Sequence, residues 1–218
     1  MKVILFGATG MVGQGVLREC LLDPEVNEIV SVVRTGSGKI DSKLHEIVHR
    51  DFLDYSGLGS AFAGADACFY CLGVSSFRME ESRYREITYG YALAAANTLA
   101  KLNPGMAFIY VSGTGADSTE KGSTMWARVR GATENALLEL PLRVTIMRPA
   151  GIVPLGGIQS RTAIYRLFYT ALTPVLPAIH RLFPKYVTTT EQIGRSMLRI
   201  ARHGAPKPVL ESRDLNLV

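Results

Sequence analysis

The chain has 218 residues, a formal net charge of +5 and a hydrophobic fraction of 47%. That length suits one well-buried α/β domain and is too short for a dinucleotide domain plus an independent substrate domain. The hydrophobic fraction is ordinary for a globular protein and excludes a disordered chain. The basic residues are scattered, with no block of Lys or Arg. We therefore expect no nucleic-acid partner, because a basic pocket for an anionic cofactor accounts for part of the excess charge.

No apolar run is long enough to span a bilayer, and the first residues read as a strand and not as a signal peptide. We therefore expect a soluble, cytoplasmic protein with no transmembrane segment. The three cysteines are Cys20, Cys68 and Cys71. Cys68 and Cys71 lie three residues apart on an expected buried strand, so their side chains point to opposite faces. We interpret them as packing residues, not as a redox or zinc pair, and expect no metal site.

The opening of the chain carries the strongest motif. An apolar run over Lys2–Phe6 leads into a glycine-rich turn, Gly7-Ala8-Thr9-Gly10-Met11-Val12-Gly13, and a helical pattern follows at once. Strand, glycine turn and helix together form the dinucleotide-binding fingerprint. The first glycine lets the chain leave the strand, the second leaves room for a pyrophosphate, and the third lets the helix pack closely. Free N–H groups at the helix N-terminus then hold the phosphates. The predicted cradle is Gly7, Thr9, Gly10, Met11 and Val12; the alternative is a purely structural turn.

Strands and helices alternate along the chain. Strands are predicted at Lys2–Phe6, Glu28–Val33, Leu44–His49, Ala65–Leu72, Met106–Val111 and Leu142–Met147. Helices are predicted at Val12–Leu22, Tyr55–Ala63, Tyr84–Leu102 and Thr124–Leu140. This rhythm predicts an α/β fold with a doubly wound parallel sheet, a Rossmann fold, covered on both faces. We expect a single domain over residues 1–218, with a dinucleotide-binding core at 1–151 and a small C-terminal substrate or lid region at 152–218.

The end of the second predicted strand bears on cofactor choice. In this fold an acidic residue there bonds the adenosine ribose and selects NAD, whereas an arginine accommodates the 2′-phosphate of NADP. Here the residue is Arg34, and no carboxylate follows until Asp41. Arg34 offers a planar fork of donors to a phosphate, and Lys39 adds a second charge. We predict NADP as the cofactor, with NAD bound less tightly; the alternative is a solvated loop arginine.

The spacing Gly-x-x-Gly-x-x-Gly resembles the extended and atypical branches of the short-chain dehydrogenase/reductase superfamily. Within them the chain is most similar to the small group of Tat-interacting-protein-like oxidoreductases, on Ser112-x-x-Gly115-Ala116-Asp117 and Arg130-Gly131. The resemblance covers residues 1–151, and the segment Val187–Ala201 looks like the closing helix of such proteins. It implies an NAD(P)-binding oxidoreductase.

The same resemblance assigns further cofactor contacts. Asp51 is placed to face the adenine amino group and Phe52 to pack on the ring, although a plain turn at the strand end explains this pair almost as well. Cys71, Leu72 and Gly73 lie where the chain passes beneath the cofactor. Pro149, after Arg148, lies where such proteins approach the nicotinamide.

The catalytic pair of the superfamily is absent. Short-chain dehydrogenases use a tyrosine as proton donor and a lysine four residues later, and the chain contains no Tyr-x-x-x-Lys. Trp126 and Arg130 stand at the corresponding positions. An indole N–H donates a hydrogen bond but cannot cycle a proton, whereas arginine keeps the positive charge that holds a ribose or phosphate. Cofactor binding is therefore expected to survive the replacement, and tyrosine-based catalysis is not.

Three interpretations remain open at this point. In the first, which we favour narrowly, the chain is an enzyme that reduces a small apolar carbonyl compound: Ser112 or Thr114 orients the carbonyl, Arg130 assists, and a tyrosine from elsewhere (Tyr84, Tyr89, Tyr91 or Tyr165) donates the proton. Each of these tyrosines has packing or surface exposure as its simpler explanation. In the second, hydride transfer needs little proton assistance. In the third, the protein is a non-catalytic redox sensor or regulator that binds the nucleotide and a protein partner.

Two segments bear on partners. Residues Ile164–Phe183 are rich in aliphatic and aromatic residues, interrupted at Pro174 and Pro177 and flanked by basic residues. They read as a helix pair packed on the sheet, or as a mobile lid over an apolar small-molecule substrate; contact with a membrane surface is less favoured because the polar face carries few charges. Alanines at positions 92, 94, 95 and 96 suit close contact with the sheet or with a second subunit in a homodimer.

Overall fold

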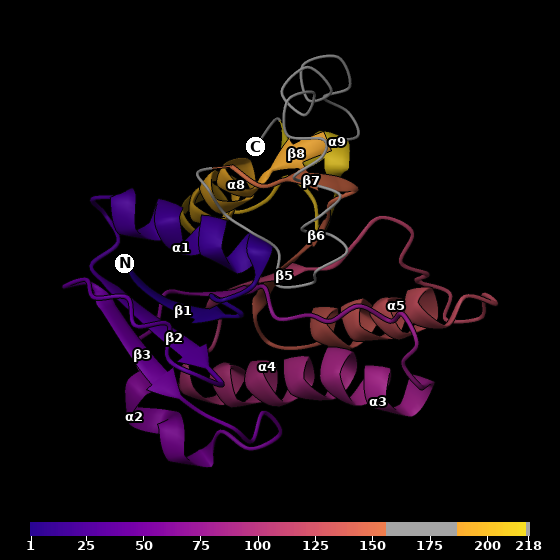
Figure 1. Ribbon diagram of the computed structural model, residues 1–218, viewed down its shortest axis with the longest axis horizontal. Helices are drawn as coiled ribbons and strands as arrows, with labels where there is room; N and C mark the ends of the chain where they lie inside the picture. The colour runs from indigo at the N-terminus through magenta and orange to yellow at the C-terminus, as the bar shows by residue number, and fades with distance from the viewer. Residues whose placement is uncertain (156–186, 217–218) are drawn as a thin grey trace.

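The computed structural model describes residues 1–155 and 187–216, so the segment Ile164–Phe183 lies outside the described residues. A seven-stranded parallel sheet forms the centre, in the order β3-β2-β1-β4-β5-β6-β9 (Figure 1). The order reverses between β1 and β4, the point at which doubly wound sheets bind their ligands. The strands are β1 (Lys2–Phe6), β2 (Glu28–Val33), β3 (Leu44–Val48), β4 (Ala67–Tyr70), β5 (Ala107–Val111), β6 (Arg143–Arg148) and β9 (Val209–Glu211).

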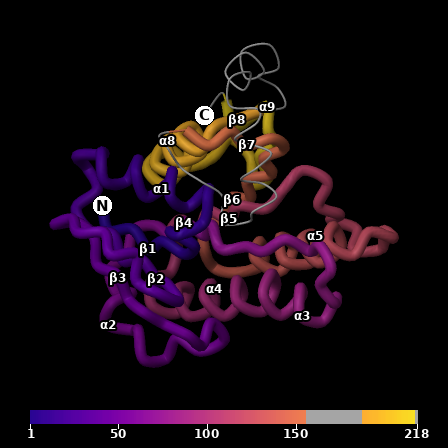
Figure 2. Tube along the Cα trace, viewed as in Figure 1, coloured from indigo at the N-terminus to yellow at the C-terminus, as the bar shows by residue number. Residues whose placement is uncertain are grey.

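Helices cover both faces of the sheet (Figures 1 and 2). One face carries α1 (Met11–Leu22) and α8 (Thr190–His203), which run side by side. The other face carries α2 (Gly59–Phe62), preceded by the short turn η1 (Ser56–Leu58), and α3 (Glu81–Arg85), the π-helical turn η2 (Glu86–Gly90), α4 (Tyr91–Leu102) and α5 (Met125–Leu138). The predicted doubly wound Rossmann fold is therefore confirmed. Within the described residues no helix is both long and apolar enough to cross a membrane.

The central strands are buried on both faces, so their side chains alternate between two hydrophobic cores. In β1, Val3 and Leu5 face the α1–α8 core, and Ile4 and Phe6 face the α4–α5 core. The alanines of α4 at positions 92, 95 and 96 are buried in the second core. Of the two expected contacts, with the sheet or with a second subunit, they make the contact with the sheet.

The cysteines follow the same alternation. Cys68 is buried in the core under α4, whereas Cys71 packs against the core under α1. Burial raises the pKa of both thiols, and it raises the pKa of Cys20 to about 12. All three cysteines are free thiols. The prediction that Cys68 and Cys71 pack on opposite faces is confirmed.

The C-terminal part contains strands that the sequence pattern did not reveal. β7 (Gly151–Val153) and β8 (Val187–Thr189) pair in parallel as a separate two-stranded sheet, and β9 pairs with β6. The expected closing helix over Val187–Ala201 therefore begins only at Thr190, because the three residues before it pair with β7. A last helix, α9 (Ser212–Leu215), follows β9. Residues 187–216 thus supply a covering helix and an edge strand to the main sheet, and the substrate or lid role of the region 152–218 stays a prediction.

The contact between α1 and α8 depends on two glycines. A Cβ atom built on Gly15 of α1 would lie 2.5 Å from Thr190 Cβ, and one built on Gly194 of α8 would lie 2.8 Å from Glu19 Cγ. Neither position has room for a methyl group, so the two helix backbones approach closely. The helix that follows the glycine turn is therefore held by contacts with both the end of β1 and α8.

We expect Gly15→Ala to destabilise the protein by about 1–3 kcal/mol, since the added methyl group overpacks a contact between two backbones. Urea denaturation measures the change. Gly59→Ala is the matched control: Gly59 has helical φ and ψ, and a Cβ there meets no atom within 4 Å. That control is expected to be neutral or to stabilise by up to about 1 kcal/mol. Equal midpoints for the two variants would contradict the close α1–α8 contact.

Candidate functional site

The glycine turn between β1 and α1 leaves no space for side chains at two of its positions. Gly7 has φ +80°, a conformation that favours glycine. A Cβ on Gly7 would lie 2.6 Å from the Leu72 nitrogen, and one on Gly13 would lie 2.0 Å from the Gly7 oxygen. The Gly10 N–H donates to the Gly7 carbonyl at 2.9 Å and closes the turn. The first turn of α1 is therefore pressed directly onto the strand end.

The N-terminus of α1 has free hydrogen-bond donors. Gly10 is its N-cap residue, no side chain caps the helix, and its first turn contains no acidic residue. The backbone N–H groups of Met11 and Val12 have no protein acceptor within the described residues. Thr9 uses its carbonyl to accept from Gln14 Nε2 at 3.2 Å. A helix N-terminus with unpaired N–H groups and a partial positive charge fits a diphosphate.

The chain leaving β4 lies against this turn. The Cys71 N–H donates to the Phe6 carbonyl at 2.9 Å, and the backbone at Cys71 and Leu72 contacts Gly7. A Cβ built on Gly73 meets no protein atom within 4 Å, so this position faces open space. The structure thus brings Cys71, Leu72 and Gly73 together with the predicted phosphate cradle.

On the other side of β1, Arg34 is exposed at the end of β2, and it forms no hydrogen bond or ion pair with any described residue. In the loop that follows, the Ser37 N–H donates to Glu46 Oε2 at 2.8 Å. The guanidinium of Arg34 is therefore free to bind an anion, and the loop beside it is held in place by β3.

The two residues predicted to contact adenine have different environments. Asp51 is exposed, and its Oδ1 accepts from the Leu53 N–H at 3.0 Å in the turn after β3. Phe52 is only 2% exposed, and its ring centroid lies 5.6 Å from that of Tyr91. The resemblance implies that Phe52 packs on the adenine ring, and the structure places the Phe52 side chain in the core under α4. There the Phe52 ring also contacts the rings of His49 and Tyr55, and these contacts hold the turn after β3 in place.

Beyond β5 the site is polar and buried. Ser112 follows β5 and is 5% exposed, and its hydroxyl donates to Glu134 Oε1. Glu134, on α5, is 1% exposed, and Arg148 at the end of β6 donates from Nε to both of its oxygens, at 3.1 and 3.0 Å. Arg148 also bonds Glu211 of β9 at 3.2 Å and the Ser118 hydroxyl at 2.7 Å. The hydrogen bonds to Glu134 raise the pKa of Arg148, so this network links the ends of β5, β6 and β9 through charge.

Arg130 lies beside this network, one helical turn before Glu134. Its Nε donates to the Tyr84 hydroxyl at 3.1 Å, and its Nη1 is 3.2 Å from a Cβ built on Gly113. Burial lowers the pKa of Arg130, and the neighbouring Tyr110 and Tyr84 raise it by more, so the guanidinium stays charged. Arg130 and Ser112, the two predicted catalytic residues, are therefore brought together at the end of β5.

The tyrosines predicted as possible proton donors differ in their surroundings. Tyr84 is the one whose hydroxyl contacts Arg130, although the residue is only 1% exposed. Tyr89 lies under the guanidinium of Arg85, and the Tyr91 hydroxyl donates to Glu86 at 3.4 Å. Tyr165 lies outside the described residues. Among the described candidates, Tyr84 alone is next to the predicted catalytic pair.

The ends of β5 and β6 are tied together near the predicted nicotinamide position. The Thr114 N–H donates to the Pro149 carbonyl at 3.0 Å, and the Thr114 hydroxyl donates to the Arg148 carbonyl at 3.0 Å. Trp126 lies over the same loop, with its Cη2 3.2 Å from a Cβ built on Gly115. Pro149 is therefore fixed beside the loop that carries Ser112.

Sequence reasoning did not identify Glu134. The signal was available: α5 buries Val129, Ala132 and Thr133 on one side, and Glu134 is a carboxylate among these buried positions. A buried carboxylate needs a cation, and Arg148, directly after an apolar strand, was the natural partner. Ser118 and Glu211 carry no comparable signal, since they reach Arg148 only through the fold.

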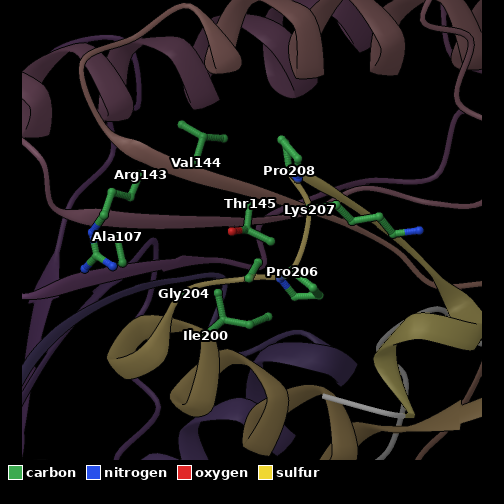
Figure 3. A pocket seen from close by; sticks show the side chains of 10 residues that line it. Ala107, Arg143, Val144, Thr145, Ile200, Gly204, Pro206, Lys207 and Pro208 are labelled. Atoms are coloured by element: carbon green, nitrogen blue, oxygen red, sulfur yellow. The ribbon is translucent and has the colours of Figure 1, made fainter.

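A separate hollow of about 340 Å³ lies at the opposite edge of the sheet (Figure 3). Ala107 and Arg143, which line it, are the first residues of β5 and β6, so the hollow is at the amino ends of the strands. Lys207 also lines the hollow, and its ammonium group forms an ion pair with Asp214 at 2.7 Å. The hollow is therefore distinct from the predicted site. Among the described residues no cluster of His, Cys, Asp or Glu is suited to a metal ion.

The geometry is that of a doubly wound sheet with a glycine turn at its switch point, and solved structures share this fold. No family model matches the sequence. A dTDP-glucose 4,6-dehydratase double mutant from Streptomyces venezuelae, with NAD bound, has 16% identity and a TM-score of 0.72 over 99% of this chain and 79% of that one. UDP-glucose 4-epimerase from Thermotoga maritima, with UDP-glucose, has 16% identity and a TM-score of 0.70 over 97% and 76%. The Bordetella bronchiseptica enzyme WbmF, with NAD+, has 13% identity and a TM-score of 0.69 over 99% and 76%. The fold is thus the Rossmann fold that the resemblance implies.

We expect Arg148→Met to destabilise the protein by about 3–5 kcal/mol, because it leaves the buried Glu134 carboxylate without its cation. Arg128→Met is the matched control. Arg128 forms an exposed ion pair with Glu81 at 2.8 Å, and such pairs contribute less than about 1 kcal/mol. Urea denaturation compares the two variants. A cost for Arg148→Met no larger than that for Arg128→Met would show that the network does not hold the strand ends.

Proposed function

We propose that the protein is an NADP(H)-dependent oxidoreductase of the atypical short-chain dehydrogenase type, acting on a small apolar carbonyl compound or its alcohol. The observation that carries the proposal is the turn at Gly7–Gly13, where a helix N-terminus with free N–H groups adjoins positions that exclude a Cβ. This chemistry fits the pyrophosphate of a dinucleotide. The fold neighbours with NAD bound support the same class of ligand.

Each predicted cofactor contact then has a role in this proposal. Gly7, Thr9, Gly10, Met11 and Val12 would hold the pyrophosphate, and the exposed Asp51 carboxylate would face the adenine. Phe52 would act through its backbone, since its ring is in the core. Gly73, Arg130 and Pro149, with Cys71 and Leu72 beneath, would hold the ribose and the nicotinamide.

The choice of NADP over NAD rests on Arg34. An exposed arginine without a protein partner can bind the 2′-phosphate through charge-assisted hydrogen bonds, and no carboxylate occupies the position that would bind a free ribose hydroxyl. When bound, the cofactor supplies hydride transfer, and the residues of the chain supply binding and orientation.

A second candidate function is supported by Trp126. This residue stands where the superfamily has its proton-donating tyrosine, and an indole cannot exchange a proton at neutral pH. A protein with an intact phosphate cradle and no such donor suits a redox sensor, which binds the nucleotide and signals its oxidation state to a protein partner. The polar residues at the end of β5 favour the enzyme.

For the cofactor preference we expect wild-type protein to bind NADP+ more tightly than NAD+. Arg34→Ala should weaken NADP+ binding by about 10- to 100-fold, the value of a charge-assisted contact to phosphate, and leave NAD+ binding unchanged. Quenching of Trp126, the single tryptophan, reports binding. Arg199→Ala is the control, since it removes an exposed arginine of α8 away from the site. Equal affinities for the two nucleotides in both proteins would discard the NADP preference.

Turnover separates enzyme from sensor. Protein incubated with NADPH and a panel of small aldehydes, ketones and quinones should consume NADPH, followed by its near-ultraviolet absorbance, above the rate without substrate. Tight NADPH binding with no consumption across the panel would favour the sensor. If the protein binds neither NADP(H) nor NAD(H), both the enzyme and the sensor proposals are wrong.

A further inference from the structure

The hydroxyl group of Ser112 has a fixed polarity. Arg148 donates to both oxygens of Glu134, so this carboxylate acts as an acceptor at each of them. The hydrogen between Ser112 Oγ and Glu134 Oε1 therefore comes from the serine. A serine hydroxyl has one hydrogen to donate, and here it points inward, toward α5.

What Ser112 can still offer to a ligand is its oxygen lone pairs. A carbonyl oxygen placed against Ser112 would meet another oxygen with no hydrogen between them. A ligand hydroxyl, in contrast, would donate to Ser112 Oγ and satisfy it. The sequence-based prediction that Ser112 polarises a carbonyl needs the opposite polarity.

The donor for a carbonyl oxygen is next to Ser112, on Arg130. The Nε of Arg130 is used by Tyr84, and its Nη1 lies against Gly113, the residue that follows Ser112. The end of β5 thus carries an acceptor and a cationic donor side by side. A ligand that matches Ser112 and Arg130 carries a hydroxyl group and a second oxygen that accepts a hydrogen bond. A compound that is converted between an alcohol and a carbonyl also matches them.

We propose that Ser112 is a hydroxyl-recognising residue and that Glu134 is a positioning residue which, held by Arg148, sets its polarity. The site therefore takes an alcohol in preference to the matching ketone at Ser112. This inference rests on the proposed function for the identity of the reaction, and it deepens that function by naming the hydroxyl-bearing form as the one the serine selects.

Binding of a matched pair to the nucleotide-free protein tests the inference without turnover. Saturation-transfer NMR competition compares cyclohexanol with cyclohexanone, which differ only in the group at one carbon. In wild-type protein we expect the alcohol to bind about three- to tenfold more tightly, the effect of one neutral hydrogen bond. Ketone binding equal to or tighter than alcohol binding, or no binding of either compound, overturns the proposal.

Variants separate the role of Glu134 from general stability. In Glu134→Gln the amide oxygen accepts from Arg148 and the amide NH₂ donates to Ser112 Oγ, which frees the serine hydrogen; the alcohol preference should disappear or reverse. Ser112→Ala should remove the preference while leaving the Arg148–Glu134 pair. Ser118→Ala, which removes another partner of Arg148, should retain it. A preference unchanged in Glu134→Gln or Ser112→Ala overturns the inference.

A direct observation covers the case in which Glu134→Gln does not fold. Neutron diffraction from wild-type crystals locates the exchanged deuterium on Ser112, which we expect on the line to Glu134 Oε1; deuterium directed elsewhere overturns the inference. Nucleotide titration is independent of both experiments. A protein that prefers the alcohol but binds no nucleotide would retain this inference about Ser112 and lose the proposed function.

Discussion

The position of α1 is the constraint on which the rest of the site depends. A Cβ on Gly13 would enter the carbonyl of Gly7, so the helix starts in contact with the end of β1. Two residues further on, Gly15 brings the same helix against Thr190 of α8. The helix is therefore fixed from both sides within its first turns. The direction of its free N–H groups is therefore fixed too, because neither contact leaves α1 freedom to shift.

The other half of the site is held by charge, not by close packing. At the ends of β5, β6 and β9, the apolar alternation of the strands gives way to Ser112, Arg148 and Glu211, and α5 supplies Glu134 between them. A buried ion pair is weak evidence for stability, because desolvation offsets much of its attraction. What it does provide is direction: the hydroxyl of Ser112 donates to Glu134 Oε1, so it cannot rotate without losing that hydrogen bond.

The sequence was sufficient for the elements whose signal is local. Hydrophobic periodicity and helix- or strand-breaking residues, which depend on neighbours in the chain, predict the glycine turn, the first six strands and the helices α4 and α5. It was insufficient for β7, β8 and β9, because each has three residues and pairs with a distant partner. The same reason applies to the site: Gly7 and Arg34 were identifiable from spacing, whereas the Ser112–Glu134 contact spans 22 residues and exists only once β5 and α5 have packed. Phe52 is a residue assigned by resemblance whose side chain lies in the aromatic core, and its contact with the adenine stays a prediction.

Under the proposed function, nucleotide binding and proton transfer depend on different residues of this chain. The residues proposed to bind and orient the nucleotide are present: the predicted phosphate cradle, an unpaired arginine after β2, and a cation on α5 in contact with Tyr84. Trp126, whose ring lies against Gly115, stands where the resemblance implies a proton-donating tyrosine. Arg130 keeps its charge in this environment, because its phenolic neighbours raise its pKa further, so it stabilises negative charge without exchanging a proton. In the proposed reaction, an alcohol at Ser112 exchanges its proton with the Tyr84 hydroxyl beside Arg130 or with solvent, and the burial of Tyr84 makes the first route depend on a ligand that reaches into the site.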